Sequence, residues 1–412
     1  MYPMKIVENK SSFNILLAIW KYLSKRRKIQ LILFTNLNIL SSFSESLSIA
    51  LTLPLISVLI DPDQIWQIKW LQNIFLNLGI NSSSKIILPI TLLFIFASII
   101  STFIKLFILR TNNFFAAAIG NDLSCLTYSR TLNQPYEKHI ELNSSETISA
   151  ATTYVDSTRE AIYSFLNFLS YFCFVITIEI TLFVFNWQVA LFSIFIFGIS
   201  YFFISYKSKL IILKNGKIIS ILTKERVQSI QEGLGSIRDV LLGSKQKEFI
   251  NKYSNIDLIY RRKIASNKFI TFSPRYIIEN IGFIFIAILA YKFSNDNSSP
   301  QNGLPVLGTF AVAAQKLLPS MQQCYNSIGT IRSNKSSVFK VLEILNQKNY
   351  IIDSKEIKPF NFEDSISLSN IEFKYPYSKN FILKDVSLLI KKGERIGIIG
   401  KTGRGKTTIT DI

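Results

Sequence analysis

The sequence predicts a mainly α-helical protein: a membrane domain of six spans with long cytoplasmic helical extensions, then the start of an α/β domain. Three observations carry this prediction. Apolar residues make up 49% of the 412-residue chain and charged residues only 18%, whereas soluble domains carry about a quarter charged residues. Lys and Arg gather between the apolar stretches, as they do in cytoplasmic loops. The last residues change to strand and turn patterns around a glycine-rich loop.

Six long apolar stretches are the candidate spans. A helix needs about 20 largely apolar residues to cross a bilayer, and the second, third and fifth stretches meet this length cleanly. The fourth is short, and the first and last carry more polar residues. In chain order the stretches are Ile29–Ile60, Ile86–Leu109, Ile162–Phe185, Val189–Ser205, Tyr276–Phe293 and Leu304–Thr330.

The basic residues predict the orientation of these spans. The cluster Lys25–Lys28 precedes the first span, and Tyr206–Arg275 holds about fifteen Lys or Arg, so both segments are expected inside. The connections Asp61–Lys85, Asn186–Gln188 and Asn295–Asn302 are then outside, and both termini are cytoplasmic. The net charge of +19 has its source in these loops. No basic and aromatic reading surface accompanies it, so we expect no nucleic-acid partner.

The sequence also predicts the bounds of the domains. Residues 1–28 form a cytoplasmic lead-in whose segment Phe13–Leu23 suits an amphipathic helix on the inner membrane surface. Residues 29–335 form the transmembrane domain, 336–365 a linker and 366–412 the start of the second domain. Within the transmembrane domain, Asn121–Arg159 and Lys207–Lys268 are predicted as long helices with turns at Pro135–Tyr136 and Gly233–Gly235.

Polar residues inside the spans are candidates for a substrate path. Ser41, Glu45, Ser48 and Thr52 share one face of the first span. A carboxylate is costly there, so Glu45 lies either on a substrate path or in a structural contact between helices or near the interface. Lys105 and Glu279 lie near span ends and are expected to reach the interface, and Arg275 stands four residues before Glu279. In the last span, Gln315 and Gln322 indicate a wet cavity.

The C-terminal stretch carries the most specific pattern. Ile366–Phe373, Asp385–Leu389 and Arg395–Ile399 are predicted strands, with a turn at Tyr375–Tyr377. The last strand leads into a match to G-x-x-x-x-G-K-[ST]. The loop residues and the start of the helix after them are Gly400, Lys401, Thr402, Gly403, Arg404, Gly405, Lys406, Thr407 and Thr408.

Each residue type in this loop has a physical role. Glycines let successive backbone N–H groups face phosphate oxygens, and the following helix directs its positive end at the anion. The Lys406 ammonium reaches the β- and γ-phosphates, and the Thr407 hydroxyl binds Mg²⁺. The sequence therefore predicts a site for ATP with Mg²⁺. Arg404 replaces the small residue common at its position, and its side chain can point outward.

Six spans followed by Phe373-Lys374-Tyr375 and FILKDVSLLIKKGERIGIIGKTGRGKTT resemble bacterial ATP-binding-cassette (ABC) exporter half-transporters, whose phosphate loop is called Walker A. The resemblance implies that Tyr375 stacks on adenine. It also implies that the regions Pro135–Glu146 and Gly233–Gly243 are coupling helices. Four patches are similar to lipid-linked oligosaccharide flippases: FSESLSIALTLPLISVL, a helix-like external loop around Trp66–Leu78, PRYIIENIGF and KLLPSMQQCYNSI.

The resemblance implies a subunit of an ATP-driven exporter or flippase in the bacterial inner membrane. Its cargo would be amphipathic, such as a lipid-linked glycan or another lipid, and its partner a second copy or a related half-transporter. The family's acidic strand end, signature motif and switch histidine do not appear before Ile412. We therefore expect a truncated cassette that does not hydrolyse ATP alone. The alternative is a non-catalytic truncated membrane protein without transport activity.

Overall fold

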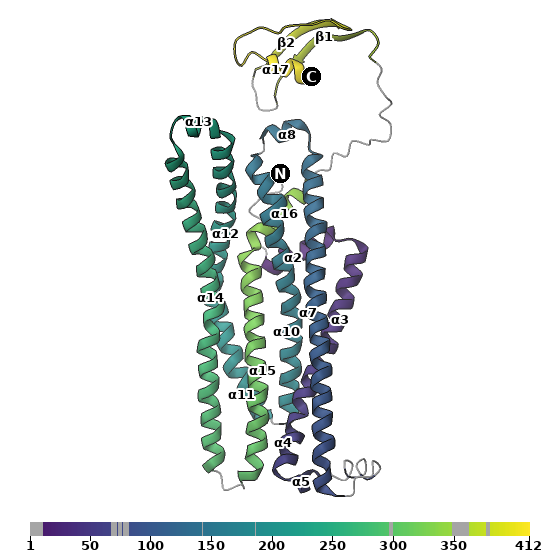
Figure 1. The fold of residues 1–412 in the computed structure, drawn as a ribbon, viewed down its shortest axis with the longest axis vertical. Helices are drawn as coiled ribbons and strands as arrows, with labels where there is room; N and C mark the ends of the chain where they lie inside the picture. The colour runs from purple at the N-terminus through teal and green to yellow at the C-terminus, as the bar shows by residue number, and fades with distance from the viewer. Residues whose placement is uncertain are drawn as a thin grey trace. The chain divides into compact units, whose positions relative to one another are not determined.

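The structure is a computed structural model, and it describes residues 11–66, 72, 76, 82–141, 143–185, 187–295, 300–347, 362–375 and 380–412. The chain divides into two compact units. The first comprises Met1–Leu132 and Ser144–Gln347, and the second comprises Asn133–Asn143 and Lys348–Ile412. Long helices make up the first unit, whereas the described part of the second holds a two-stranded sheet and short helices (Figure 1).

Every apolar stretch of the sequence lies in helical structure of the first unit. The long helices run side by side (Figure 1). The first stretch forms two helices that meet at Leu51, and the fourth contains one π-helical segment, Ile194–Gly198. The helices are α3 (Lys25–Ala50), α4 (Thr52–Ile60), α7 (Ile87–Leu132), α10 (Val155–Phe185), α11 (Trp187–Ser193), α12 (Ile199–Gly235), α14 (Gln246–Asn295) and α15 (Pro300–Ser333).

The predicted extensions beyond the spans are present as continuous helix. Helix α7 has 46 residues and α14 has 50 residues. At 1.5 Å per residue these helices are about 69 and 75 Å long, more than twice the ~30 Å hydrocarbon core of a bilayer. Each helix therefore continues well outside any membrane that it crosses.

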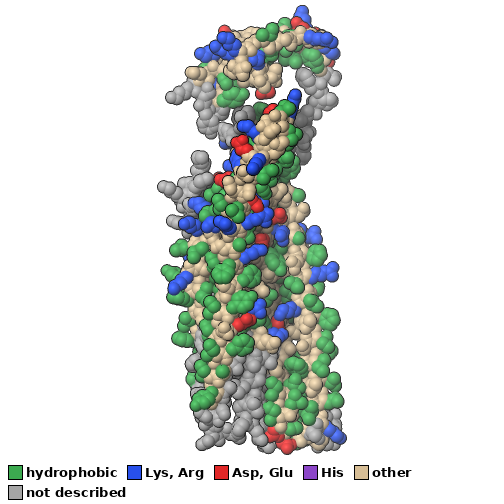
Figure 2. Space-filling view, turned by 60° about the vertical axis from the view of Figure 1, so that its left-hand side comes forward, with side chains coloured by type: hydrophobic (Ala, Val, Ile, Leu, Met, Phe, Trp, Pro, Cys, Tyr) green, Lys and Arg blue, Asp and Glu red, His purple; other side chains and the backbone are tan. Residues whose placement is uncertain are grey.

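Two helical stretches of the described residues are long and apolar enough to cross a membrane. They are Ile87–Leu132 and Ser144–Val184, with mean hydropathies of 2.5 and 1.8 in their most apolar windows. Only 11% and 22% of those windows are buried inside the protein, so the apolar side chains point outward, where lipid would cover them. Apolar side chains cover much of the helical surface seen in Figure 2.

The predicted turns lie close to their expected positions. A break at residues 133–135 separates α7 from helix α8 (Tyr136–Glu141). Helix α12 continues through Gly233 and ends at Gly235, slightly later than expected, and the chain reverses through the short helix α13 (Ile237–Leu242). Most of the predicted external helix around Trp66–Leu78 lies outside the described residues, which include α5 (Pro62–Trp66) before it.

The N-terminal amphipathic segment packs on protein as well as exposing an apolar face. It forms α2 (Ser12–Ala18) and a 3₁₀ turn, η1 (Ile19–Tyr22). Its buried Ile15, Leu16 and Ile19 join one apolar core with α7, α10 and helix α16 (Lys335–Leu345). On the other face, Leu17 is 54% exposed and Trp20 37% exposed. The predicted linker begins at residue 336, but α16 forms a packed helix there, and the N-terminal segment covers it.

A three-residue ion cluster also binds α16 to its neighbours. Glu146 lies on α9 (Ser144–Ser149) and accepts hydrogen bonds from Lys224 of α12 at 2.8 Å and Lys340 of α16 at 2.9 Å. Burial alone would raise the pKa of the Glu146 carboxyl. The hydrogen bonds and positive charges of the two lysines outweigh burial, and hold this pKa below its ordinary value of 4.5. The ionised carboxylate is therefore the form that the fold stabilises.

Glu146→Gln is expected to lower the stability of the helical unit by about 1.5–3 kcal/mol at pH 7, because it weakens two charged hydrogen bonds. Since the folded pKa is the lower one, this stabilisation is present above pH 4.5 and is lost as the pH falls through the folded value. The gap in thermal unfolding temperature between wild type and variant should therefore close below pH 4.5.

Glu343→Gln is the matched control for this prediction. Glu343 also faces Lys340, at 3.4 Å, but its side chain is 40% exposed, so its removal is expected to cost less than about 1 kcal/mol. An equal loss of stability in both variants would contradict the role of Glu146 in the ion cluster. A loss in Glu146→Gln that does not change with pH would contradict it as well.

In the second unit, strand β1 (Ser365–Phe373) pairs antiparallel with β2 (Leu383–Lys391). This confirms the first two predicted strands with longer bounds. The third prediction, Arg395–Ile399, was wrong: these residues have no strand structure, and Ile399 is 97% exposed. A strand requires a neighbour to pair its N–H and C=O groups, and the described sheet contains only β1 and β2. The loop then enters α17 (Lys406–Asp411). Of the turn predicted at Tyr375–Tyr377, only Tyr375 is described.

Candidate functional site

The glycine-rich loop of the second unit adopts a backbone that requires glycine. Gly403 and Gly405 have φ angles of +82° and +84°, a region that side-chain-bearing residues rarely occupy. A Cβ atom at Gly405 would also lie 2.8 Å from Cγ2 of Ile382 and 3.1 Å from Cδ2 of Leu383. Two independent constraints therefore explain the second glycine of the motif.

The loop ends at the first turn of α17. Gly405 is the N-cap and offers no side-chain cap, and the first N–H groups of a helix have no intrahelical partners. Residues Gly400–Arg404 are exposed, as is Thr407, whereas Thr408 is only 6% exposed. Thr407 therefore offers an accessible hydroxyl beside these N–H groups, which fits the oxygen-rich coordination of Mg²⁺ with phosphate.

Lys406 extends its side chain back over the loop. Its ammonium donates to the carbonyl oxygens of Gly400 at 2.7 Å and Lys401 at 3.0 Å. The ammonium thus lies at the edge of the loop, where it can exchange these carbonyls for phosphate oxygens. This position fits the role that the sequence predicts for it.

Tyr375 lies next to the same helix. Its hydroxyl is 3.3 Å from Oγ1 of Thr408, and its ring packs edge-on against Phe373 with 5.1 Å between ring centroids. The fold thereby brings Tyr375 beside residues that lie more than thirty positions later. Part of its side chain stays exposed, as an aromatic residue that stacks on a base requires.

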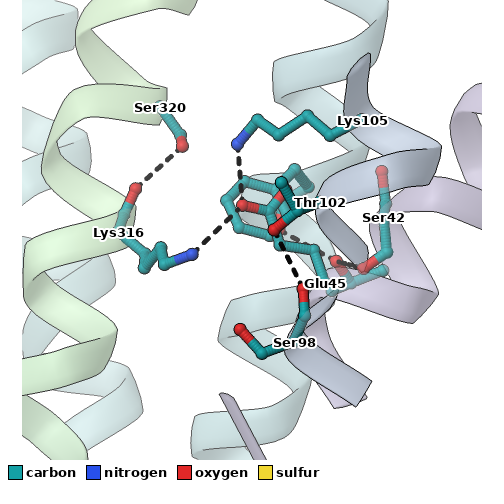
Figure 3. Close-up of polar contacts among 9 residues, drawn as sticks. Ser42, Glu45, Ser98, Thr102, Lys105, Lys316 and Ser320 are labelled. Atoms are coloured by element: carbon teal, nitrogen blue, oxygen red, sulfur yellow. Dashed lines mark hydrogen bonds and ion pairs between the residues drawn. The ribbon is translucent and has the colours of Figure 1, made fainter. Parts of the chain in front are cut away.

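A second polar site lies within the helical unit, around Glu45. The carboxylate of Glu45 is 2.7 Å from the ammonium of Lys105 and 3.5 Å from that of Lys316 (Figure 3). The three residues come from α3, α7 and α15. The ammonium of Lys105, which the sequence led us to expect at the membrane interface, is paired with this carboxylate of the neighbouring helix. The sequence analysis did not anticipate the pairing of Lys316, since nothing in a linear sequence shows which spans face each other.

Gln315 and Gln322 differ in their surroundings. Gln315 is exposed. Gln322 is only 3% exposed, and its amide donates to the Thr271 carbonyl at 2.8 Å and accepts from the Tyr201 hydroxyl at 3.0 Å. Its polar atoms thus connect α15 to α14 and α12, an arrangement that also supports the helical packing.

Two further carboxylates of the spans have local partners. Arg275 donates to Glu279 at 2.9 Å, which confirms the pair predicted from their spacing. The hydroxyl of Ser193 lies 2.9 Å from one oxygen of Glu179. Among the described residues, no three His, Cys, Asp or Glu side chains form a group that could hold a metal ion.

The chain is similar to known transport proteins over most of its length. Over 349 residues it is 27% identical to an export ATP-binding/permease protein of Rickettsia bellii, and this match covers 80% of the chain and 56% of that protein. Over 302 residues it is 24% identical to an ATP-dependent lipid A-core flippase of Francisella tularensis subsp. holarctica, covering 69% of the chain and 47% of the flippase.

A shorter match is closer in sequence. Over 82 residues the chain is 35% identical to a multidrug resistance ABC transporter ATP-binding/permease protein of Bacillus subtilis, covering 20% of the chain and 14% of that protein. No protein-family model matches the chain. The chain spans about half the length of the curated relatives that it matches. By these matches, together with its long apolar helices and its glycine-rich loop, the chain is similar to export ATP-binding/permease proteins and to an ATP-dependent flippase.

Proposed function

We propose that the chain contributes the membrane domain and the phosphate-binding loop to a subunit of an ATP-driven exporter or flippase. Six spans (α3 with α4, α7, α10, α11 with α12, α14 and α15) would cross the bacterial inner membrane, with both termini in the cytoplasm. The cargo would be amphipathic, a lipid or a lipid-linked glycan. The observation that carries the proposal is the loop Gly400–Thr407, in which the required glycine conformations and the Lys406 ammonium occur together.

In this proposal the residues of the loop bind the nucleotide. Backbone N–H groups at Gly403–Thr407 bind phosphate oxygens, and the Lys406 ammonium neutralises charge on the β- and γ-phosphates. The Thr407 hydroxyl contributes one ligand to Mg²⁺, and Tyr375 supplies a stacking surface for adenine. ATP then supplies the free energy for the conformational change.

The helical unit would respond to nucleotide binding as one of a pair. A half-transporter pairs with a second copy or a close relative, and a twofold pair is the commonest assembly. The short helices α8 and α13 lie at the turns between long helices, where coupling helices would receive motion from the nucleotide domains. The path for the cargo would run past Glu45 and Gln315, with Gln322 holding the helices that line it.

The test is ATP-dependent lipid movement by the natural gene product that contains this chain. The protein is reconstituted in vesicles with a fluorescent short-chain phospholipid, and dithionite quenching reports how much probe reaches each leaflet. ATP with Mg²⁺ is expected to raise the rate of translocation at least severalfold, whereas a non-hydrolysable analogue should not sustain it. Equal rates with and without ATP would favour the alternative, a non-catalytic membrane protein.

A further inference from the structure

Three helices bring one carboxylate and two ammonium groups to a single point. Glu45 of α3 is nearly buried, with 8% of its side chain exposed, and lies between Lys105 of α7 and Lys316 of α15 (Figure 3). The lysine side chains are 50% and 48% exposed. The carboxylate is thus enclosed, whereas about half of each lysine side chain is exposed.

This cluster has an excess of positive charge. Two ammonium groups and one carboxylate leave a net charge of +1, and in the described part of the chain Glu45 is the only carboxylate paired with these lysines. Glu45 lies about 20 residues after the start of α3 and about 15 before the end of α4, or about 30 and 22 Å along the helices. Glu45 therefore lies near the middle of the first span, where a charged side chain costs about 2.5–3.5 kcal/mol or more.

The hydroxyl groups around the cluster do not supply donors for a ligand. Ser42, Thr102 and Ser320 each donate to a carbonyl of their own helix, at 2.8–2.9 Å. A lysine ammonium has three N–H donors, and Lys105 uses one of them on Glu45. The donors that the two lysines do not use on Glu45 are cationic, and they suit a ligand with several negatively charged oxygens.

We propose that Lys105 and Lys316 bind the anionic, phosphate-bearing headgroup of an amphipathic cargo, and that Glu45 is a resident counter-ion which this headgroup displaces. The proposal deepens the proposed function, on which the word cargo rests. With the site empty, Glu45 neutralises one of the two positive charges. A phosphate group between the lysines neutralises the remaining charge and competes with the carboxylate for the same donors. The site therefore favours anionic over zwitterionic lipids.

If the Glu45 carboxylate competes with the headgroup for the lysines, removing its charge should strengthen lipid binding, which a purely structural ion pair would not do. Binding is measured by calorimetry on the 412-residue chain in detergent, without nucleotide, using short-chain phosphatidic acid. Lys105→Gln and Lys316→Gln are each expected to weaken binding at least about tenfold, or 1.4 kcal/mol. Glu45→Gln, which has nearly the same shape, removes the competitor and is expected to tighten binding by about tenfold.

Lys207→Gln is the matched control. Lys207 also lies on a long helix and contacts a phenylalanine ring, at 4.4 Å from Phe203, as Lys105 does at 5.5 Å from Phe174. This variant should leave affinity unchanged, and short-chain phosphatidylcholine should bind wild type at least about tenfold more weakly than phosphatidic acid. If a lysine variant fails to fold, Glu45→Gln still decides the matter.

Three results would overturn the proposal. The first is weaker binding by Glu45→Gln, which would show that the carboxylate only supports the fold. The second is equal affinity for the anionic and zwitterionic lipids. The third is inorganic phosphate binding as tightly as phosphatidic acid with the same dependence on the lysines, which would make the site one for a free anion. Because no assay uses ATP, the binding pattern can hold even if ATP-driven transport fails, and the two failures are distinguishable.

Discussion

Lys406→Ala is expected to reduce the affinity of the chain for MgATP by at least about a hundredfold, or 2.8 kcal/mol. The ammonium of Lys406 already lies over the loop, on the carbonyls of Gly400 and Lys401. In the nucleotide complex it would donate to two phosphate groups instead. Each hydrogen bond to a charged group contributes about 1.5–3 kcal/mol, so the loss of two accounts for the expected change.

Binding is measured with a fluorescent ATP analogue on the chain in detergent, with and without Mg²⁺. Because Thr407 is accessible at the first turn of α17, wild type should bind more tightly when Mg²⁺ is present. The variant should bind weakly under both conditions. Its helical content should match wild type, because the long helices belong to the other compact unit.

Lys401→Ala is the matched control, because it removes a different lysine of the same loop and leaves the Lys406 ammonium in place. The backbone carbonyl of residue 401, which accepts from Lys406, remains in this variant, and the side chain of Lys401 is exposed. We expect at most about a threefold change in affinity, or less than 1 kcal/mol. Equal binding by wild type and Lys406→Ala would disprove the phosphate-loop assignment, and with it the nucleotide site of the proposed function.

Gly216→Ala is expected to destabilise the helical unit by about 1–3 kcal/mol or more. Gly216 lies on α12 where it crosses the end of α15, and a Cβ atom there would be 2.2 Å from the backbone oxygen of Ser333. Ser333 cannot move freely, because Asn267 of α14 donates to its hydroxyl at 2.8 Å and Asn215 donates to Asn267 at 2.9 Å. The clash therefore strains all three helices.

Alanine substitution at two other glycines of the helical unit is expected to cost less stability. At Gly329 a Cβ would lie 2.3 Å from Cγ2 of Thr271, a side-chain atom that can shift at smaller cost than backbone. At Gly198 a Cβ meets nothing within 4 Å. Thermal unfolding followed by tryptophan fluorescence should rank the alanine variants Gly216, Gly329 and Gly198 from least to most stable. A Gly216 variant as stable as the Gly198 variant would contradict the close crossing of α12 and α15.

Much of the secondary structure could be predicted because it depends on nearby residues. The apolar stretches form helical structure, since about 20 apolar residues at helical spacing specify it. The pair Arg275–Glu279 could be predicted in the same way, because residues four apart in a helix are neighbours. In the loop, Gly403 and Gly405 have positive φ angles, so glycine stands at the positions whose backbone conformation favours it.

Other features could not be predicted because they depend on a distant partner. Arg395–Ile399 has the composition of a strand, but strand structure requires a paired neighbour, and the described sheet contains none for it. The N-terminal segment has the pattern of a membrane-surface helix. Its amphipathic face cannot reveal that Ile15 and Ile19 pack against α16, more than three hundred residues later.

The helices, their approximate lengths and the phosphate loop thus follow from residue order, because the interactions that specify them extend over only a few positions. The site around Glu45 follows from the packing of α3, α7 and α15. Sequence indicates that Glu45, Lys105 and Lys316 are each costly in a membrane. Which of them meet depends on how three helices rotate and shift against one another, and their packing brings one carboxylate between two ammonium groups.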